Sequence, residues 1–188
     1  MRLFVALDVP EAVRAALIEL TERFRKTCPG ARWVKLEGAH ITLKFIGEVS
    51  SEKLEEIRSA LGAISHFDPI TVRFAGLGFF PSPRRPRVFW AGVEGGAPLA
   101  QLAAAIEMKL EPLGIAPEKR AFQAHLTLAR FESPQDSRGL AAAVEALGSP
   151  EFGNETFSEF HLYQSVLKRS GAEYTRLVSY PLHKEPAP

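Results

Sequence analysis

The sequence predicts a fold of mixed helices and strands built from two similar lobes. Segments with helical apolar spacing alternate along the chain with short stretches rich in β-branched residues. Several of these elements recur in the same order at a nearly constant offset. The 188 residues, 46% hydrophobic and 24% charged, are enough for one globular domain with a buried core. We therefore expect one domain over residues 1–188, made of two intertwined, pseudo-symmetric lobes.

Four helices are predicted from apolar residues spaced three or four positions apart. The first begins at Pro10, the second after Ser51 and the third near Pro98, while the fourth carries Leu140, Val144 and Leu147. The second and fourth end at Gly62 and Gly148. Strands are expected near residues 2–8, 40–47, 69–79, 87–93, 125–131, 155–165 and 174–180. The terminal residues 184–188 are expected to be disordered.

An internal repeat relates the two halves of the chain. The tetrapeptide His-Ile-Thr-Leu at 40–43 matches His-Leu-Thr-Leu at 125–128, an offset of 85 residues. The same offset relates residues 2–6 to 87–91, Thr71 to Thr156 and Leu77 to Leu162. A duplication of this kind implies two similar lobes packed about a pseudo-two-fold axis, with equivalent elements facing each other.

Composition excludes several classes of protein. The net charge of +1 argues against coating nucleic acid through bulk charge, although a local basic patch is compatible with it. Cys28 is the single cysteine, so neither an internal disulfide nor a cysteine-based zinc site is possible. The apolar run at residues 3–7 is too short for a signal peptide or a membrane span. We expect a soluble, cytoplasmic monomer without membrane association.

The two His-x-Thr motifs are the residues that point to chemistry. Because residues i and i+2 of a strand share a face, His40 lies beside Thr42, and His125 lies beside Thr127. The intervening and following apolar residues, Ile41, Leu43 and Phe45 in the first copy and Leu126 and Leu128 in the second, are expected to face the core. Two such motifs would arise by chance roughly 0.014 times in a chain of this composition.

Two imidazoles and two hydroxyls in one cleft suit acid/base catalysis at phosphorus. Imidazole titrates near neutral pH, so one ring can act as a general base while the other acts as a general acid. Threonine hydroxyls donate hydrogen bonds to phosphate oxygens without adding charge. No third ligand stands at metal-binding spacing, and neither a P-loop nor a dinucleotide fingerprint occurs, so no metal and no cofactor are expected.

At these residues the sequence resembles the two-histidine phosphoesterase superfamily, and within it the RNA 2′,3′-cyclic phosphodiesterases, often called 2′-5′ RNA ligases. The resemblance covers nearly the whole chain and is carried by residues 2–8, 40–48, 80–87, 125–130 and 162–165. Ala124 departs from the pattern, because the family often has proline before the second histidine.

The resemblance implies an α+β, bilobal duplicated fold, with an antiparallel sheet in each lobe, helices outside and the active cleft between the lobes. It also implies metal-independent hydrolysis of a terminal ribose 2′,3′-cyclic phosphate on RNA, tRNA fragments included, to a 2′-phosphate. On this chain His40 would be the proton donor and His125 the proton acceptor. Thr42 and Thr127 would hold the phosphate oxygens.

Four basic residues are further candidates for substrate contact. Lys44 lies two residues beyond Thr42, Arg130 ends the second motif strand, and Arg84 and Arg85 lie in a proline-rich loop. For each, an ordinary solvated or ion-paired role is the alternative. A second function also stays open, namely an RNA-end binding module with weak or reversible 2′-5′ end-joining activity. Turnover of a small nucleoside 2′,3′-cyclic phosphate would discriminate between the two functions.

Overall fold

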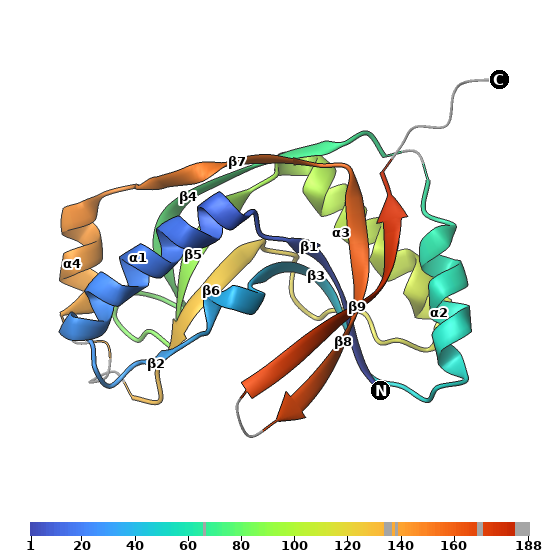
Figure 1. The fold of residues 1–188 in the computed structure, drawn as a ribbon, viewed down its shortest axis with the longest axis horizontal. Helices are drawn as coiled ribbons and strands as arrows, with labels where there is room; N and C mark the ends of the chain where they lie inside the picture. The colour runs from blue at the N-terminus through green and yellow to red at the C-terminus, as the bar shows by residue number, and fades with distance from the viewer. Residues whose placement is uncertain (66, 134–136, 138, 169–170, 183–188) are drawn as a thin grey trace.

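Two antiparallel sheets form the framework of the chain (Figure 1). A computed structural model describes residues 1–65, 67–133, 137, 139–168 and 171–182. The four-stranded sheet has the order β3 (His40–Glu48), β1 (Arg2–Asp8), β8 (Glu159–Lys168) and β9 (Gly171–Pro181). The five-stranded sheet has the order β2 (Arg32–Trp33), β6 (His125–Arg130), β5 (Val88–Glu94), β4 (Ile70–Phe80) and β7 (Glu151–Phe157). The predicted α+β fold with an antiparallel sheet in each lobe is confirmed.

Each sheet contains strands from both halves of the sequence. In the four-stranded sheet, β8 from the second half pairs with β1, so that Ser165 lies opposite Arg2. In the five-stranded sheet, β4 from the first half pairs with both β5 and β7. The short strand β2 also crosses over, because Arg32 pairs with Arg130 of β6. These exchanges tie the two halves together through backbone hydrogen bonds.

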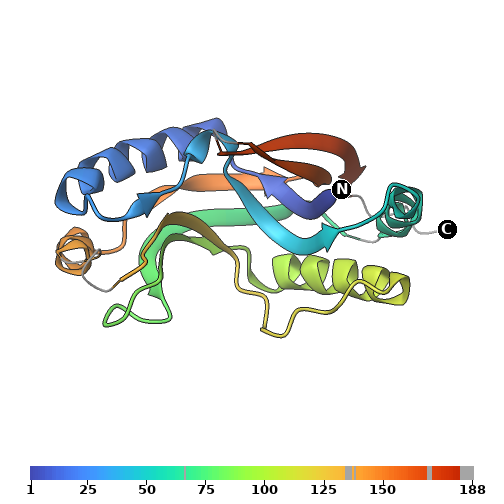
Figure 2. The same cartoon turned by 90° about the horizontal axis from the view of Figure 1, so that it is seen from below.

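The helices are exchanged in the same way. Helix α1 (Glu11–Thr27) packs on the five-stranded sheet, where Phe24 contacts Phe89 of β5 edge to face at 5.9 Å between ring centroids. Helix α4 (Leu140–Leu147) lies beside it (Figure 1). Helices α2 (Lys53–Gly62) and α3 (Gly96–Leu110) contact each other and the four-stranded sheet, as Figure 2 shows from below. Short 3-10 turns, η1 (Leu36–Gly38) and η2 (Glu111–Leu113), precede the approaches to β3 and β6.

The core lies between the helices and the inner faces of the sheets. Leu17 of α1, Ile57 of α2, Ile106 of α3 and Leu140 of α4 are each fully buried, as the helical periodicity predicts. Burial of such a side chain contributes about 1.5–3 kcal/mol to folding before entropy is counted. No helix of the described residues is long and apolar enough to cross a membrane.

The predicted elements differ from the structure in two places. The strand expected at 155–165 is divided at Ser158 into β7 and β8, which belong to different sheets. The two-residue strand β2 has too few residues to show a period and was not predicted. The predicted disordered tail, residues 184–188, lies outside the described residues.

Candidate active site

The two His-x-Thr motifs begin equivalent strands, one in each sheet. His40 starts β3 and His125 starts β6, and the four motif side chains are all partly buried. The two strands approach each other, with Cα atoms within 8 Å, although no sheet ladder joins them. The structure therefore brings the two motif strands close together, and of the four predicted residues Thr42 and His125 line the same cleft, whereas His40 and Thr127 are not among its lining residues.

Both imidazoles are held by the same backbone contact. Nδ1 of His40 lies 2.9 Å from the carbonyl oxygen of Gly38, and Nδ1 of His125 lies 2.8 Å from that of Gln123. A carbonyl oxygen can only accept, so Nδ1 must carry the proton in each ring. Nε2 is then the nitrogen that can gain or lose a proton, which is the arrangement that acid/base catalysis requires.

Aromatic rings fix the plane of each histidine. Phe4 stacks on His40 with ring centroids 4.5 Å apart, and Tyr174 meets the same ring edge to face at 4.9 Å. His125 is met edge to face by Phe80 at 5.1 Å. These contacts leave each ring few orientations, so its Nε2 is preorganised.

The surroundings of His40 are charged as well as aromatic. Asp8 lies opposite His40 in the β1–β3 ladder and is bonded to Arg176 and to the hydroxyl of Tyr163. Burial lowers the pKa of His40 below the usual histidine value, while the hydrogen bond to Gly38 and the carboxylate of Asp8 oppose that shift. In the free cleft His40 is therefore more readily neutral than an exposed histidine.

A third histidine belongs to this charged cluster. His161 of β8 is buried; its Nδ1 lies 2.9 Å from the Ser179 hydroxyl and its Nε2 lies 3.8 Å from Asp8. Burial lowers the pKa of His161, with the Asp8 carboxylate opposing that shift. His161 lies outside both His-x-Thr motifs. Within the described residues, no group of three or more His, Cys, Asp or Glu side chains is placed to hold a metal ion.

A β-bulge follows each motif and reverses the sheet face toward which the next side chains point. Thr42 pairs with Ala6 and Lys44 with Val5, so Leu43 is the extra residue in β3. An equivalent bulge at Leu128 of β6 follows from the β5–β6 register, which shifts between Phe89 and Trp90. The bulge recurs at the repeat offset of 85 residues, so it is part of the duplicated motif.

Two predictions for β3 are wrong because of this bulge. Lys44 was predicted to share the face of His40, yet it is 2% exposed and its ammonium donates to Glu107 and to the carbonyl of Ala116, both at 2.7 Å. The ammonium of Lys44 is therefore bound by groups of the protein itself. Phe45 was predicted to face the core, yet it is 54% exposed. Strict alternation fails here because one extra residue reverses the parity of the strand.

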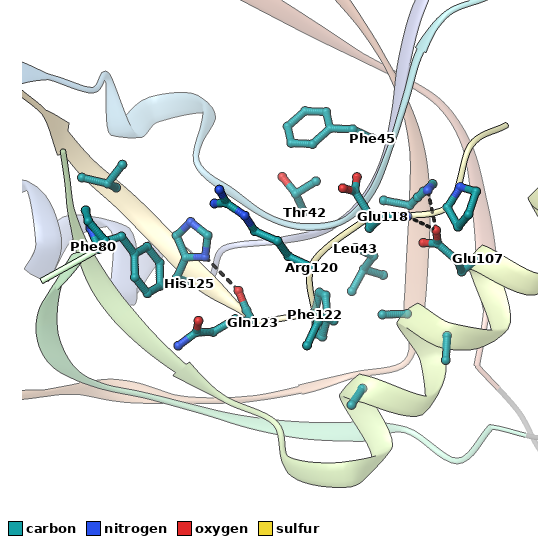
Figure 3. Close-up of a pocket in the computed structure, with 18 of the residues that line it drawn as sticks. Thr42, Leu43, Phe45, Phe80, Glu107, Glu118, Arg120, Phe122, Gln123 and His125 are labelled. Atoms are coloured by element: carbon teal, nitrogen blue, oxygen red, sulfur yellow. Dashed lines mark hydrogen bonds and ion pairs between the residues drawn. The ribbon is translucent and has the colours of Figure 1, made fainter. Parts of the chain in front are cut away.

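A cleft of about 930 Å³ adjoins the motifs (Figure 3). It extends from Thr42 of β3 and His125 of β6 to one face of α3 and to the loop of residues 114–124 that precedes β6. Phe45, Phe80, Arg87, Arg120 and Phe122 also line it. Sequence reasoning missed Arg120, because a single arginine in a loop between two elements carries no periodic signal.

The other predicted basic contacts do not line this cleft. Arg84 and Arg85 are exposed in the connection between β4 and β5, and of the three arginines in that connection Arg87 alone lines the cleft. Arg130 ends β6 opposite Arg32 of β2, and it too is exposed. Each of these three guanidinium groups is therefore a solvated charge in the free protein.

Comparison with known proteins identifies the family of this chain. The family profile described as LigT like Phosphoesterase matches residues 7–90 and 93–174. The chain belongs to this family of LigT-like phosphoesterases. The matched segments follow the two halves of the chain, each with one His-x-Thr motif.

Close relatives share one name. An RNA 2′,3′-cyclic phosphodiesterase of Archaeoglobus fulgidus is 37% identical over 177 residues, which cover 94% of this chain and 98% of the relative. A protein of the same name from Aeropyrum pernix is 38% identical over 162 residues, which cover 86% of this chain and 92% of the relative. Among solved structures, TT0787 of Thermus thermophilus superposes with a TM-score of 0.80 at 33% identity, over 99% of this chain and 100% of that one. Apo LigT of Escherichia coli superposes with a TM-score of 0.77 at 29% identity, over 97% of this chain and 98% of that one.

Proposed function

We propose that this protein hydrolyses the terminal 2′,3′-cyclic phosphate of RNA to a 2′-phosphate, by metal-independent acid/base catalysis. The observation that carries the proposal is the matched geometry of His40 and His125. Each ring donates Nδ1–H to a carbonyl two residues earlier and keeps Nε2 for proton transfer. The relatives named RNA 2′,3′-cyclic phosphodiesterase, one with 98% of its length matched, support the choice of substrate.

The reaction is an in-line displacement at phosphorus. Nε2 of His125 takes a proton from water as the water oxygen bonds to phosphorus. The bond from phosphorus to the ribose 3′ oxygen breaks on the opposite side, and Nε2 of protonated His40 gives that oxygen its proton. Thr42 and Thr127 donate hydrogen bonds to the non-bridging oxygens as negative charge develops on them. The product keeps the phosphate on the 2′ oxygen.

Asp8 supports the assignment of His40 as the acid. Its carboxylate lies opposite His40 in the β1–β3 ladder and favours the imidazolium form. The strand position paired with His125 is Gly92, which has no side chain to offer a charge. A bound cyclic phosphate adds a second negative charge near His40 and opposes the desolvation that lowers its pKa in the free cleft.

The proposal is tested by incubating the protein with cytidine 2′,3′-cyclic phosphate in excess chelator and resolving the products by phosphorus NMR. We expect turnover to persist without added metal and to give the 2′-phosphate alone, because the cleft holds the ring in one productive orientation. A dominant 3′-phosphate would exchange the roles of the two histidines. Activity lost in chelator and restored by one divalent metal would overturn the metal-independent mechanism.

We also propose that the protein acts as a cytoplasmic monomer on RNA fragments, including those of tRNA. The single cysteine, Cys28, is buried at the end of α1 and is compatible with a reducing compartment. Light scattering during gel filtration tests the monomer, and comparison of cyclic-ended tRNA fragments with unstructured oligonucleotides tests the substrate.

A further inference from the structure

The positive charges that line the cleft are not equally available to a ligand. The described lining residues include Lys44, Arg87 and Arg120. Lys44 is neutralised by Glu107, and Nη1 of Arg87 donates to the carbonyl oxygen of Glu132. Arg120 is exposed and makes no hydrogen bond or ion pair with any other described residue. Arg87 keeps its charge and its remaining donors, because the carbonyl is neutral and accepts from one N–H group. Among the described cations that line the cleft, Arg120 is the one whose donors are all unused by other described residues.

The position of Arg120 directs those donors to the motif residues. It belongs to the loop of residues 114–124 that connects η2 to β6. In Figure 3 its side chain extends across the cleft toward His125 and Thr42. A guanidinium has five donors in a planar fork that matches two phosphate oxygens. Neither threonine can supply that charge.

Lys44 and Glu107 hold the loop in this position. The ammonium of Lys44, whose side chain is 1% exposed, binds Glu107 and the carbonyl of Ala116. The same oxygen of Glu107 accepts the backbone N–H of Glu118 at 2.5 Å. One buried ion pair thus fixes two points of the loop shortly before Arg120. At the other end of the loop, the carbonyl of Gln123 is bonded to His125.

We propose that Arg120 binds a phosphate of the RNA end, and that the Lys44–Glu107 ion pair is the positioning device that keeps Arg120 over the cleft. The inference rests on the proposed function for the identity of the ligand. The phosphate is either the reacting cyclic phosphate or the phosphodiester on its 5′ side. Phe122 of the same loop and Phe45 of β3 provide exposed aromatic surface for the adjoining bases.

The test measures kcat and KM of Arg120→Gln for two substrates. Cytidine 2′,3′-cyclic phosphate contains only the cyclic phosphate, whereas a trinucleotide with the same end also contains phosphodiesters. The matched control is Lys119→Gln, which removes a neighbouring exposed charge that does not line the cleft. We expect Arg120→Gln to lower kcat/KM about ten-fold, the usual worth of a charge-assisted hydrogen bond, while Lys119→Gln changes it little.

The two substrates identify the phosphate. An equal loss on both assigns Arg120 to the cyclic phosphate. A loss confined to the trinucleotide assigns it to the phosphodiester, and the log–log salt dependence of trinucleotide binding should then become shallower by about 0.7. An Arg120→Gln protein that handles both substrates like the wild type would overturn the proposal. So would an equal effect of Lys119→Gln, because bulk charge would then explain the result.

A binding measurement separates this inference from the proposed function. If the wild type turns over neither substrate, the proposed function fails. The affinity of wild type, Arg120→Gln and Lys119→Gln for a labelled trinucleotide ending in a 2′-phosphate then decides the role of Arg120 independently.

The positioning role is tested with Lys44→Met, with and without Arg120→Gln. We expect Lys44→Met to weaken trinucleotide binding in the wild-type background and to add nothing when Arg120 is already replaced. Fully additive losses would overturn the link between the ion pair and Arg120. If Lys44→Met does not fold, the double variant Lys44→Met/Glu107→Leu, which removes both charges and leaves neither of them buried alone, serves the same test.

Discussion

The hydroxyls of Thr71 and Thr156 lie 2.9 Å apart, although 85 residues separate them in sequence. They face each other across the antiparallel ladder of β4 and β7. The offset of 85 is also that of the two histidine motifs, so each threonine pairs with its own counterpart in the other half. In the expected arrangement of two lobes about a pseudo-two-fold axis, such a pair would lie on either side of the axis.

The first prediction concerns this pair. Valine keeps the β-branched shape that the strand prefers but cannot form the hydrogen bond. Each of Thr71→Val and Thr156→Val should lower the free energy of unfolding by about 0.2–1 kcal/mol, the usual worth of a cross-strand pair. The double variant should be no less stable than either single one, because the second change removes a hydroxyl that is already unpaired. Urea denaturation measures this, with Thr175→Val on β9 as the control; additive losses would contradict a shared bond.

The second prediction concerns the histidines. His40→Ala and His125→Ala should each lower kcat by about 10²–10⁴, because each removes a positioned proton donor or acceptor. Circular dichroism should show an intact fold, since both side chains are only partly buried. His161→Ala, which removes a histidine from the charged cluster but from neither motif, is the comparison variant. A folded His125→Ala protein with wild-type turnover would contradict the assignment.

The placement of the histidines and threonines on two equivalent strands could be predicted, because strand periodicity and the repeat agree at these positions. The sheet face of Lys44 and Phe45, two and three residues beyond Thr42, was predicted wrongly. A bulge leaves no mark on hydrophobic periodicity until its partner strand is known, and here the partner is β1, far away in sequence. The exchange of β8 into the first sheet was unpredictable for the same reason, because register is a property of two strands. The position of Arg120 could not be predicted either, because its loop is held by tertiary contacts of Lys44 and Glu107, which come from other elements.

The third prediction concerns the threonines. Thr42→Val and Thr127→Val keep the shape of each side chain and remove one donor to the phosphate. If these donors act as charge shifts onto the non-bridging oxygens, the loss should fall mainly on kcat and amount to roughly 2–4 kcal/mol in activation free energy. Steady-state kinetics on cytidine 2′,3′-cyclic phosphate measures it. A rise in KM with kcat unchanged would mean that the hydroxyls bind the ground state only.

The fourth prediction concerns the ion pair under the loop. Glu107→Gln leaves the ammonium of Lys44 buried without a counter-charge, whereas Lys44→Met leaves a carboxylate that is 23% exposed and can be rehydrated. Breaking a buried pair costs about 3–5 kcal/mol when the remaining charge stays buried. We therefore expect Glu107→Gln to be the more destabilising change in urea denaturation. The reverse order would mean that Lys44 reaches water in the variant.

The last prediction concerns pH. As the proposed acid, His40 must be protonated in the active enzyme, and burial lowers its pKa in the free cleft. Its proton is lost as the pH rises through that lowered pKa, so the alkaline limb of kcat/KM should lie below pH 6.5, the ordinary value for histidine. In kcat, which reports the substrate complex, the same limb should move to higher pH because the bound phosphate anion favours the imidazolium. Proton NMR of the imidazole Cε1–H resonances, assigned with His40→Ala, measures the free-state value directly. An alkaline limb at the same pH in kcat and kcat/KM would show that phosphate does not act on His40.

The same lowered pKa makes the free energy of unfolding depend on pH in the opposite direction to activity. The unfolded chain binds the proton of His40 more tightly than the folded chain does. The free energy of unfolding should therefore fall as the pH decreases from 6.5 toward the folded-state pKa, and His40→Ala should weaken that dependence.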